Sequence, residues 1–252
     1  MNLCSELHRL SLCDNICLNN YPSKGGDTEM CLLIICQTAA REFILPLLLS
    51  RRILMHKTMV FIDYQNFNIN LIKHYNGKNF KSINYKNLSK ELNAYVPLES
   101  EVIKTYLFAY KPCDELLQLE SYKRYYEWLS GAMKHVPYLE VIEGRQDIHR
   151  IKGVVFDINN ADTYTTEEKE TDINLATHMV AKGFQNAYDI AILVSGDTDY
   201  VNVVKTLHEL GKIIVIAHFK HQNIQKYDGT YDAEIIMYDN ILDKSSNHKK
   251  QN

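Results

Sequence analysis

The chain has 252 residues, of which 46% are apolar and 23% are charged, so it is long enough and apolar enough to build a sizeable core. Its 28 basic and 31 acidic residues give a formal charge of −3, which excludes a strongly basic protein that coats nucleic acid by charge alone. Any binding of nucleic acid must therefore come from a local basic face or through a bridging metal ion. This length fits one medium domain, or one domain with an extension.

Residues 1–57 differ in composition from the rest of the chain. They hold five of the six cysteines but contain no C-x-x-C and no matched histidine pair, which disfavours a zinc site. We expect reduced thiols and a cytoplasmic protein, because the rest of the chain carries only Cys113. The apolar stretch Cys31–Ser50 has Arg41 and Glu42 at its centre, a charged pair that is costly in lipid. We therefore expect a buried or loosely docked helix there and no membrane span.

From Met59 onward, apolar runs alternate with helix-like patterns. We predict strands over residues 59–62, 101–110, 138–142, 151–158, 189–194, 212–217 and 234–238. We predict helices over residues 68–75, 85–92, 114–133, 172–182 and 200–210. Strands that alternate with helices indicate an α/β protein with a parallel, helix-covered sheet. We accordingly divide the chain into an extension of unclear order or an over-long start (1–57), one domain (58–241) and a polar tail (242–252).

Acidic residues follow two of the predicted strands and open one of the helices. Asp63 comes directly after the strand at 59–62, Asp197 and Asp199 follow the strand at 189–194, and Asp172 opens the helix at 172–182. In open α/β sheets, ligands bind beyond the carboxyl ends of the strands. Carboxylates that meet there repel each other unless a cation is present, and Mg²⁺, or Mn²⁺ in its place, prefers oxygen ligands. The pattern predicts a metal site formed by these four aspartates.

Each acid also has a purely structural interpretation. Asp63 can cap the helix at 68–75, Asp199 can cap the helix at Tyr200, and Asp172 can serve the helix dipole alone. Asp197, in a tight turn behind Gly196, is the hardest to explain in this way. Taken together, the acids favour a functional site. Neutral side chains close to them in the sequence are candidates to hold water or phosphate: Asn66, Ser195 and Thr198.

The motifs that carry these acids also resemble a known family. FIDYQNF resembles the D-x-x-N motif, KETD the K-x-x-D motif and SGDTDY the SGD-[ST]-D-[FY] motif of the NYN domain, a PIN-like nuclease fold that includes the LabA-like branch. The resemblance spans about Met59–Asp239. It implies a three-layer α/β/α sandwich with a mostly parallel sheet, and metal-dependent cleavage of RNA by water. The chain departs from the family at Tyr200, where Phe is commoner, and at Val201–Asn202, which lacks a frequent Pro.

The family's acidic positions correspond to Asp63, Asp172, Asp197 and Asp199 in this sequence. The resemblance therefore implies that these four residues bind the metal and act in catalysis. Lys169, three residues before Asp172, is a candidate to steady that carboxylate or to contact a phosphate, although a surface lysine in a charged run is an equal alternative.

Two segments are candidate nucleic-acid contacts. Residues 144–153 (GRQDIHRIKG) carry Arg145, His149, Arg150 and Lys152, which form either a phosphate-binding edge or a solvated hairpin. Residues 122–128 (YKRYYEW) mix bases with aromatics, as a stacking surface for single strands does. Their helical spacing favours a core face instead, with Lys123, Arg124 and Glu127 on its wet side.

We infer a metal-dependent endoribonuclease-type hydrolase that acts on single-stranded RNA, with Mg²⁺ or Mn²⁺ as cofactor. The alternative is a non-catalytic NYN-type module that binds RNA or protein. A phosphatase of the haloacid-dehalogenase type needs a second Asp two residues after the first, and Gln65 stands there. No phosphate loop and no serine nucleophile elbow is present. The oligomeric state is not readable from the sequence.

Overall fold

The computed structural model describes residues 55–78 and 82–246 of the chain. The chain divides into two units, Met1–Leu54 and Met55–Asn252, and every described residue belongs to the second. The cysteine-rich leader and the apolar stretch Cys31–Ser50 therefore lie outside the described residues. Within the described part, no helix is long and apolar enough to cross a membrane.

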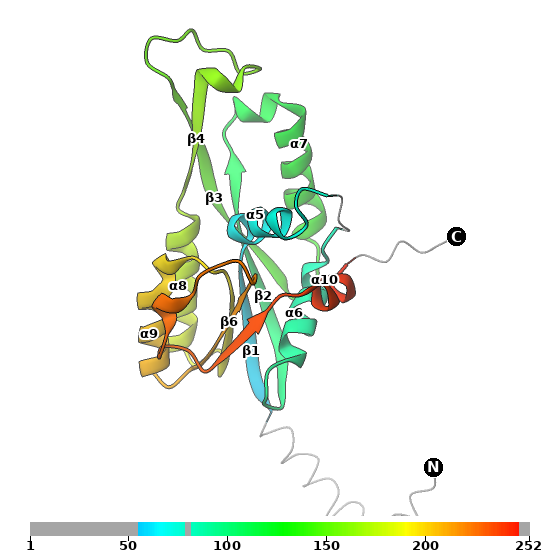
Figure 1. The fold of residues 1–252 in the computed structure, drawn as a ribbon, viewed down its shortest axis with the longest axis vertical. Coiled ribbons are helices and arrows are strands. Elements are labelled where there is room, and N and C mark those ends of the chain that lie inside the picture. The colour runs from blue at the N-terminus through cyan, green and yellow to red at the C-terminus, as the bar shows by residue number, and fades with distance from the viewer. Residues whose placement is uncertain (1–54, 79–81, 247–252) are drawn as a thin grey trace, which may run out of the picture. The chain divides into compact units, whose positions relative to one another are not determined.

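A seven-stranded sheet, ordered β4-β3-β2-β1-β5-β6-β7, forms the centre of this unit (Figure 1). All neighbouring strands pair in parallel except β3 and β4, which are antiparallel. The strands are β1 (His56–Asp63), β2 (Ser100–Pro112), β3 (Leu139–Arg150), β4 (Tyr164–Lys169), β5 (Ile190–Val194), β6 (Ile213–His218) and β7 (Ala233–Ile236). The predicted α/β class with a mostly parallel sheet is confirmed.

Helices connect most of these strands. The α-helices of the described residues are α5 (Tyr64–His74), α6 (Tyr85–Ala94), α7 (Glu120–Glu127), α8 (Thr171–Phe184), α9 (Val201–Glu209) and α10 (Asp239–Lys244). Short helical turns are η3 (Leu116–Gln118), the π-helical η4 (Trp128–Met133), η5 (Ala161–Thr163), η6 (Thr198–Tyr200) and η7 (Gln225–Tyr227).

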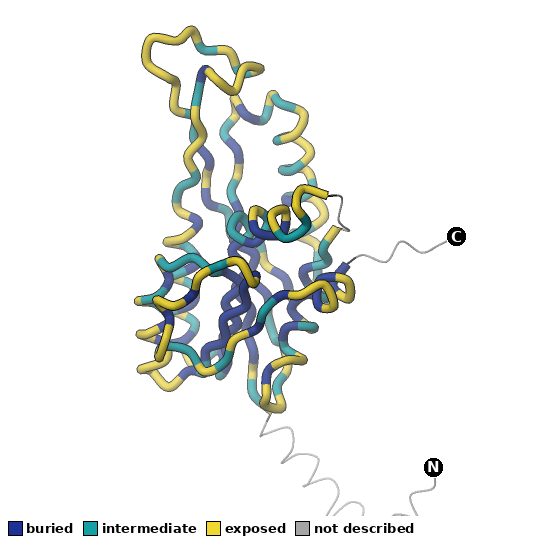
Figure 2. The backbone as a smooth tube through the Cα atoms, viewed as in Figure 1, coloured by how far each residue is buried: buried dark blue, intermediate teal, exposed yellow. Residues whose placement is uncertain are grey.

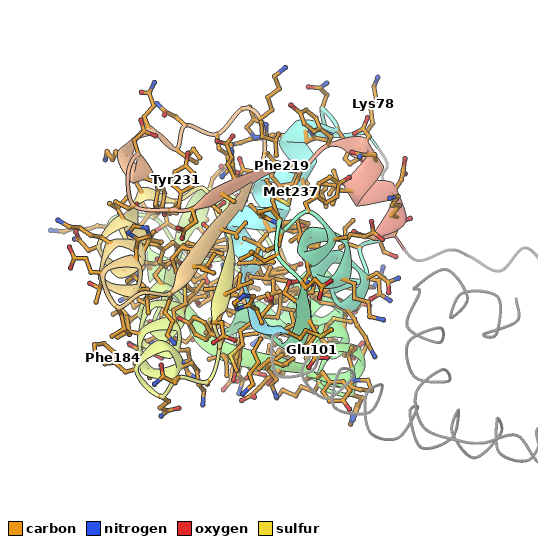
Figure 3. All side chains as sticks on the ribbon, turned by 90° about the horizontal axis from the view of Figure 1, so that it is seen from below. Lys78, Glu101, Phe184, Phe219, Tyr231 and Met237 are labelled. Carbon is orange, nitrogen blue, oxygen red and sulfur yellow. The ribbon has the colours of Figure 1, made fainter. Side chains whose placement is uncertain are left out.

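The central strands are buried on both faces, which their unbroken apolar runs predict (Figure 2). In β1, Val60 and Ile62 pack on one side of the sheet, and Met59 and Phe61 pack on the other. The first side is covered by residues of α5, α6 and α10, and the second by residues of α8 and α9. Figure 3 shows these two groups of helices on opposite sides of the strands. This packing fixes the carboxyl ends of β1 and β5 side by side.

The single helix predicted over 114–133 is wrong, because the segment breaks into η3, α7 and η4. Leu119 is extended, with φ −81° and ψ 128°, and it separates η3 from α7. Leu116 and Leu129 are both fully buried. On one continuous α-helix these two side chains would point about 140° apart, so the break is what lets both reach the core.

The strand predicted over 151–158 is also wrong. β3 runs on to Arg150, and Val155 in the following loop is 89% exposed, so this apolar run has no face to bury. The strand that follows β3 in the chain and pairs with its outer side is β4, whose sequence YTTEEK is polar. An edge strand of this kind carries no apolar alternation, and the sequence pattern therefore misses it. The helix α10 was likewise not predicted.

We predict that Gly144→Ala destabilises the domain, because β3 crosses the β4–α8 connection at Gly144. A Cβ there would lie 2.6 Å from the carbonyl oxygen of Lys169 and 2.9 Å from the backbone nitrogen of Thr171. Backbone cannot yield as a side-chain tip can, and overpacking of this kind costs about 1–3 kcal/mol of unfolding free energy. Denaturant unfolding measures the loss.

Gly131→Ala is the matched control, since a Cβ at Gly131 meets nothing within 4 Å. It should leave the unfolding free energy unchanged or raise it by up to about 1 kcal/mol. Equal stability of Gly144→Ala and the wild type would show that this crossing is not tightly packed.

Candidate active site

Asp63 is the last residue of β1 and the N-cap of α5, which starts at the next residue and not at Asn68 as predicted. Its side chain is only 4% exposed. Its Oδ1 accepts the backbone N–H of Asn66 at 3.0 Å, and its Oδ2 accepts the Ser195 hydroxyl at 3.1 Å. The Tyr200 hydroxyl lies 3.3 Å from the same Oδ2. Three donors from two segments thus hold one buried carboxylate at the carboxyl end of β1.

Tyr200 joins Asp63 to Asp172. The ring of Tyr200 is buried, and its hydroxyl lies 2.5 Å from Oδ1 of Asp172. Because a hydroxyl carries one hydrogen, the short contact to Asp172 is the preferred bond and the longer one to Asp63 is the alternative. Asp172 stands in the first turn of α8, after Glu170 in a left-handed conformation with φ 75°. This tight junction turns the start of α8 toward Asp63.

Asp197 and Asp199 lie in the turn between β5 and α9. The backbone N–H of Asp197 donates to the Ser195 hydroxyl oxygen at 3.1 Å, and Oδ1 of Asp197 accepts the N–H of Asp199 at 3.1 Å. Asp197 therefore caps η6, a role for which the sequence analysis considered only Asp199. The structure brings Asp63, Asp172 and Asp197 together; Asp63 is buried and Asp197 half-buried, while Asp172 and, at the rim, Asp199 are exposed.

Glu168 is a further acid at this site, and the sequence analysis missed it. It lies on β4 opposite Gln146 of β3, and its charge acts on the same surroundings as the charges of Asp63 and Asp172. Its Oε2 is buried without a hydrogen-bond partner among the described residues. Alternate residues of a strand point to opposite faces, so Glu168 faces away from the neighbouring Glu167. Only the register of the polar strand β4 reveals this, because the sequence EEKE reads as a solvated charged run.

Burial, together with nearby negative charge, raises the pKa of Asp63. Burial raises the pKa of this carboxyl to about 6. The backbone N–H of Asn66 and the hydroxyl of Ser195 oppose the shift, while the charges of Asp172 and Asp197 add to it. A buried acid with acidic neighbours of this kind is typical of a functional site.

The pKa of Glu168 shifts in the same direction. Burial raises it to about 7, the Thr171 hydroxyl lowers it, and the charges of Asp63 and Asp172 raise it further. Burial and the same two charges also raise the pKa of Tyr200 far above its usual value, so this phenol stays a hydrogen-bond donor.

The side chain of Asn66 holds the turn that carries Asp197. Its Oδ1 accepts the N–H of Gly196 at 3.3 Å and the amide of Gln222 at 2.9 Å. A Cβ at Gly196 would lie 2.5 Å from Nε2 of Gln222, so a larger residue there would displace the Gln222 side chain that bonds Asn66. The backbone oxygen of Asn66 accepts the amide of Asn70 at 2.7 Å. The D-x-x-N motif therefore builds the site through Asp63 and ties its two loops together through Asn66.

The other predicted supporting residues take part in local contacts. Ser195 donates to Asp63 while it accepts from Asp197, and Oγ1 of Thr198 lies 3.4 Å from Nζ of Lys226. Lys169 pairs with Glu167 at 3.2 Å and points to the opposite side of β4 from Glu168.

The basic segment 144–153 forms part of the β3–β4 hairpin, and most of its charges are already paired. Arg145 pairs with Asp147 at 3.4 Å and with Glu170 at 3.3 Å, and His149 contacts Glu167 at 2.6 Å. Arg150 lies over the ring of Phe156, with 4.5 Å between its guanidinium carbon and the ring centroid. Lys152 is exposed and makes no ion pair with a described residue. The arrangement is closer to a solvated hairpin than to an open phosphate-binding edge.

The segment 122–128 packs as a core face. Tyr125, Tyr126 and Trp128 pack against the buried cluster on the α5–α6 side of the sheet. Lys123, Arg124 and Glu127 are exposed, as predicted for the wet side.

The motifs found in the sequence and the arrangement of these acids agree with a comparison against known families. A family model described as the NYN domain matches residues 57–232. The chain belongs to the NYN domain family. At a coarse level this membership indicates a PIN-like nuclease fold and a hydrolase. No curated protein matches the chain.

The solved structures that this NYN domain is similar to include a crystal structure of VPA0982 from Vibrio parahaemolyticus, a protein of unknown function. The two share 18% sequence identity with a TM-score of 0.49, and the similarity covers 75% of this chain and 97% of the other.

The donor atoms of the acid cluster fit a hard divalent cation. Carboxylate oxygens are the ligands that Mg²⁺ and Mn²⁺ prefer, and the buried, unpartnered Oε2 of Glu168 is an unused ligand atom. Within the described ranges, no three His, Cys, Asp or Glu side chains already converge as a metal-binding group. The Tyr200 hydroxyl lies between Asp63 and Asp172, and Oδ1 of Asp197 is turned to the Asp199 N–H. Binding a cation between Asp63 and Asp172 therefore requires the Tyr200 hydroxyl to move away.

We predict that the metal-free domain loses stability as the pH rises from about 4 to about 7. The unfolded chain releases the protons of Asp63 and Glu168 near pH 4, whereas the folded chain holds them until about 6 and 7. Over this interval the folded state binds more protons, so the unfolding free energy falls with rising pH. Asp63→Asn keeps a capping residue and removes the contribution of Asp63 to this loss. It should therefore stabilise the metal-free domain by about 1–3 kcal/mol near pH 8.

Urea unfolding in EDTA across this pH range measures the difference between variant and wild type. Asp114→Asn is the control, because Asp114 is exposed and makes no contact with the cluster; its profile should follow that of the wild type. If the pH profile of Asp63→Asn runs parallel to the wild-type profile, Asp63 does not have the raised pKa.

Proposed function

We propose that this NYN domain hydrolyses phosphodiester bonds in single-stranded RNA, with Mg²⁺ or Mn²⁺ bound by the acid cluster. The observation that carries the proposal is that the charges of Asp172 and Asp197 act on the buried Asp63, and those of Asp63 and Asp172 act on Glu168. Acids that act on one another in this way are costly without a cation, and carboxylates are the ligands such a cation takes. Asp199, at the rim, would accept a hydrogen bond from a water molecule bound to the metal.

A bound Mg²⁺ or Mn²⁺ would polarise the phosphoryl group, lower the pKa of a water molecule and neutralise the leaving oxygen. The protein's own residues set up this chemistry. Ser195 and the N–H of Asn66 orient the carboxylate of Asp63, and Asn66 holds the turn that carries Asp197. The Tyr200 hydroxyl keeps Asp172 directed at Asp63 until the cation enters.

The helices on the two faces of the sheet support the finer fold assignment, which is the three-layer α/β/α arrangement of PIN-like nucleases. We also propose a cytoplasmic location, because the thiols of the sequence suit a reducing compartment. The choice of RNA over DNA, and internal over terminal cleavage, rests on the family alone.

The direct test is incubation of end-labelled single-stranded RNA with the full chain, in Mg²⁺ or Mn²⁺ and with or without EDTA. We expect cleavage that EDTA abolishes. Asp172→Asn and Asp197→Asn should each lower the rate at least about 100-fold, because each removes a carboxylate that would bind the metal. Both variants should keep the wild-type circular dichroism spectrum.

Asp114→Asn again serves as the control and should cleave at the wild-type rate. A folded protein that cleaves no RNA with any divalent ion would contradict the proposal and favour the binding module. Release of phosphate from a small phosphomonoester, with RNA left intact, would favour a phosphatase.

We further predict that Glu168→Gln raises the Mg²⁺ concentration needed for half-maximal cleavage by about 10-fold or more, because it removes one anionic oxygen from the cluster while keeping the shape of the side chain. A titration of cleavage rate against Mg²⁺ measures this. Glu167→Gln is the matched control, since Glu167 is exposed, faces away from the cluster and pairs with His149. Equal Mg²⁺ dependence of both variants would remove Glu168 from the site.

A further inference from the structure

A cavity of 440 Å³ opens between the start of α5, the start of α6 and the end of η4. Three aromatic side chains, Tyr64, Tyr85 and Trp128, line it together with aliphatic residues. We call it the ring pocket. Its volume lies within the range of small-molecule sites. None of the acids of the active site lines it, so the active site leaves its role unexplained.

The three rings form one connected aromatic wall. The ring centroids of Tyr64 and Trp128 are 5.5 Å apart, those of Tyr85 and Trp128 are 6.2 Å apart, and those of Tyr64 and Tyr85 are 6.3 Å apart. Planar aromatic surface of this kind binds other planar rings by stacking. Tyr85 is buried, while Tyr64 and Trp128 are each half-buried.

Polar groups on this wall lack partners. The Tyr64 hydroxyl, the Trp128 indole N–H and the Asn68 side-chain amide make no hydrogen bond to any residue that the structure describes. These half-buried groups are open to water or to a ligand, and an apolar ligand would leave them unsatisfied. A planar ligand with donors and acceptors around its edge satisfies both the rings and the polar groups.

The ring pocket begins one residue after Asp63, on the α5–α6 side of the sheet, whereas Tyr200 and α8 pack on the other side. Tyr64 follows Asp63 directly in the sequence, and Tyr64 and Asn68 lie one turn apart on the same side of α5. Lys86 adds a positive charge to the lining, which suits a ligand that carries a phosphate. A strand whose phosphate lies at Asp63 would pass over the carboxyl end of β1 to place an adjacent base in the pocket.

We propose that the ring pocket binds one nucleobase of the substrate strand, stacked against Trp128 and Tyr64, and so helps to place the neighbouring phosphodiester at the acids. This inference rests on the proposed function for the identity of the strand. Its binding step needs neither metal nor cleavage. Binding to the ring pocket can therefore be measured separately from the nuclease activity.

The test uses the fluorescence of Trp128, which is the only tryptophan of the chain. The full chain is titrated in EDTA with each of the four ribonucleoside 5′-monophosphates, with excitation at the red edge of the indole absorption to avoid the bases. We expect saturable quenching by at least one nucleotide and none by ribose 5-phosphate, which lacks the base. Ala132→Phe, which puts a large side chain into the lining, should weaken the binding at least about 10-fold.

His135→Phe is the matched control, because it introduces the same side chain at an exposed position outside the lining. It should bind like the wild type. The proposal is overturned if no nucleotide quenches Trp128 saturably, if ribose 5-phosphate quenches equally, or if Ala132→Phe binds as tightly as His135→Phe. Nucleotide binding without RNA cleavage would support the ring pocket and contradict the proposed function. RNA cleavage without nucleotide binding would support the proposed function and contradict the ring pocket.

Discussion

The buried carboxylate of Asp63, with acidic neighbours at the carboxyl end of β1, is the constraint around which this domain is built. Asp63 is almost fully buried, and both of its oxygens face hydrogen-bond donors: the N–H of Asn66, the hydroxyl of Ser195 and the hydroxyl of Tyr200. These donors come from the segment after β1 and the segment after β5. The hydrogen bonds that compensate the charge of Asp63 therefore also join these two segments, and the second segment carries Asp197.

The same donors explain why the acids tolerate one another without a cation. The Tyr200 hydroxyl shares its hydrogen between Asp172 and Asp63, and the Asp199 N–H neutralises part of the charge of Asp197. A Phe in place of Tyr200 would supply no such donor. We infer that this domain alternates between a hydrogen-bonded form and a metal-bound form. The raised pKa of Asp63 reflects the free energy needed to keep this buried acid ionised in the hydrogen-bonded form.

Much of this site was predictable from the sequence because its acids follow apolar strands. The strands β1 and β5 are unbroken apolar runs, so the positions of Asp63 and Asp197 at the sheet edge could be read directly. Asp172 was placed because it opens the helix predicted over 172–182. Glu168 could not be found in this way, because β4 is polar and its register depends on antiparallel pairing with β3. Side-chain directions were equally out of reach: Asp197 and Asp199 look equivalent in SGDTDY, yet one caps η6 within the cluster and the other lies at the rim.

The most direct test of the account is the anomalous scattering of Mn²⁺ in crystals of the domain. The account predicts an anomalous peak about 2.1 Å from carboxylate oxygens of Asp63 and Asp172, with the Tyr200 hydroxyl displaced from between them. Glu168 or Asp197 should complete the protein ligands. Crystals in which Mn²⁺ binds elsewhere, while Tyr200 still bridges Asp63 and Asp172, would contradict the central claim that these acids are a cation site.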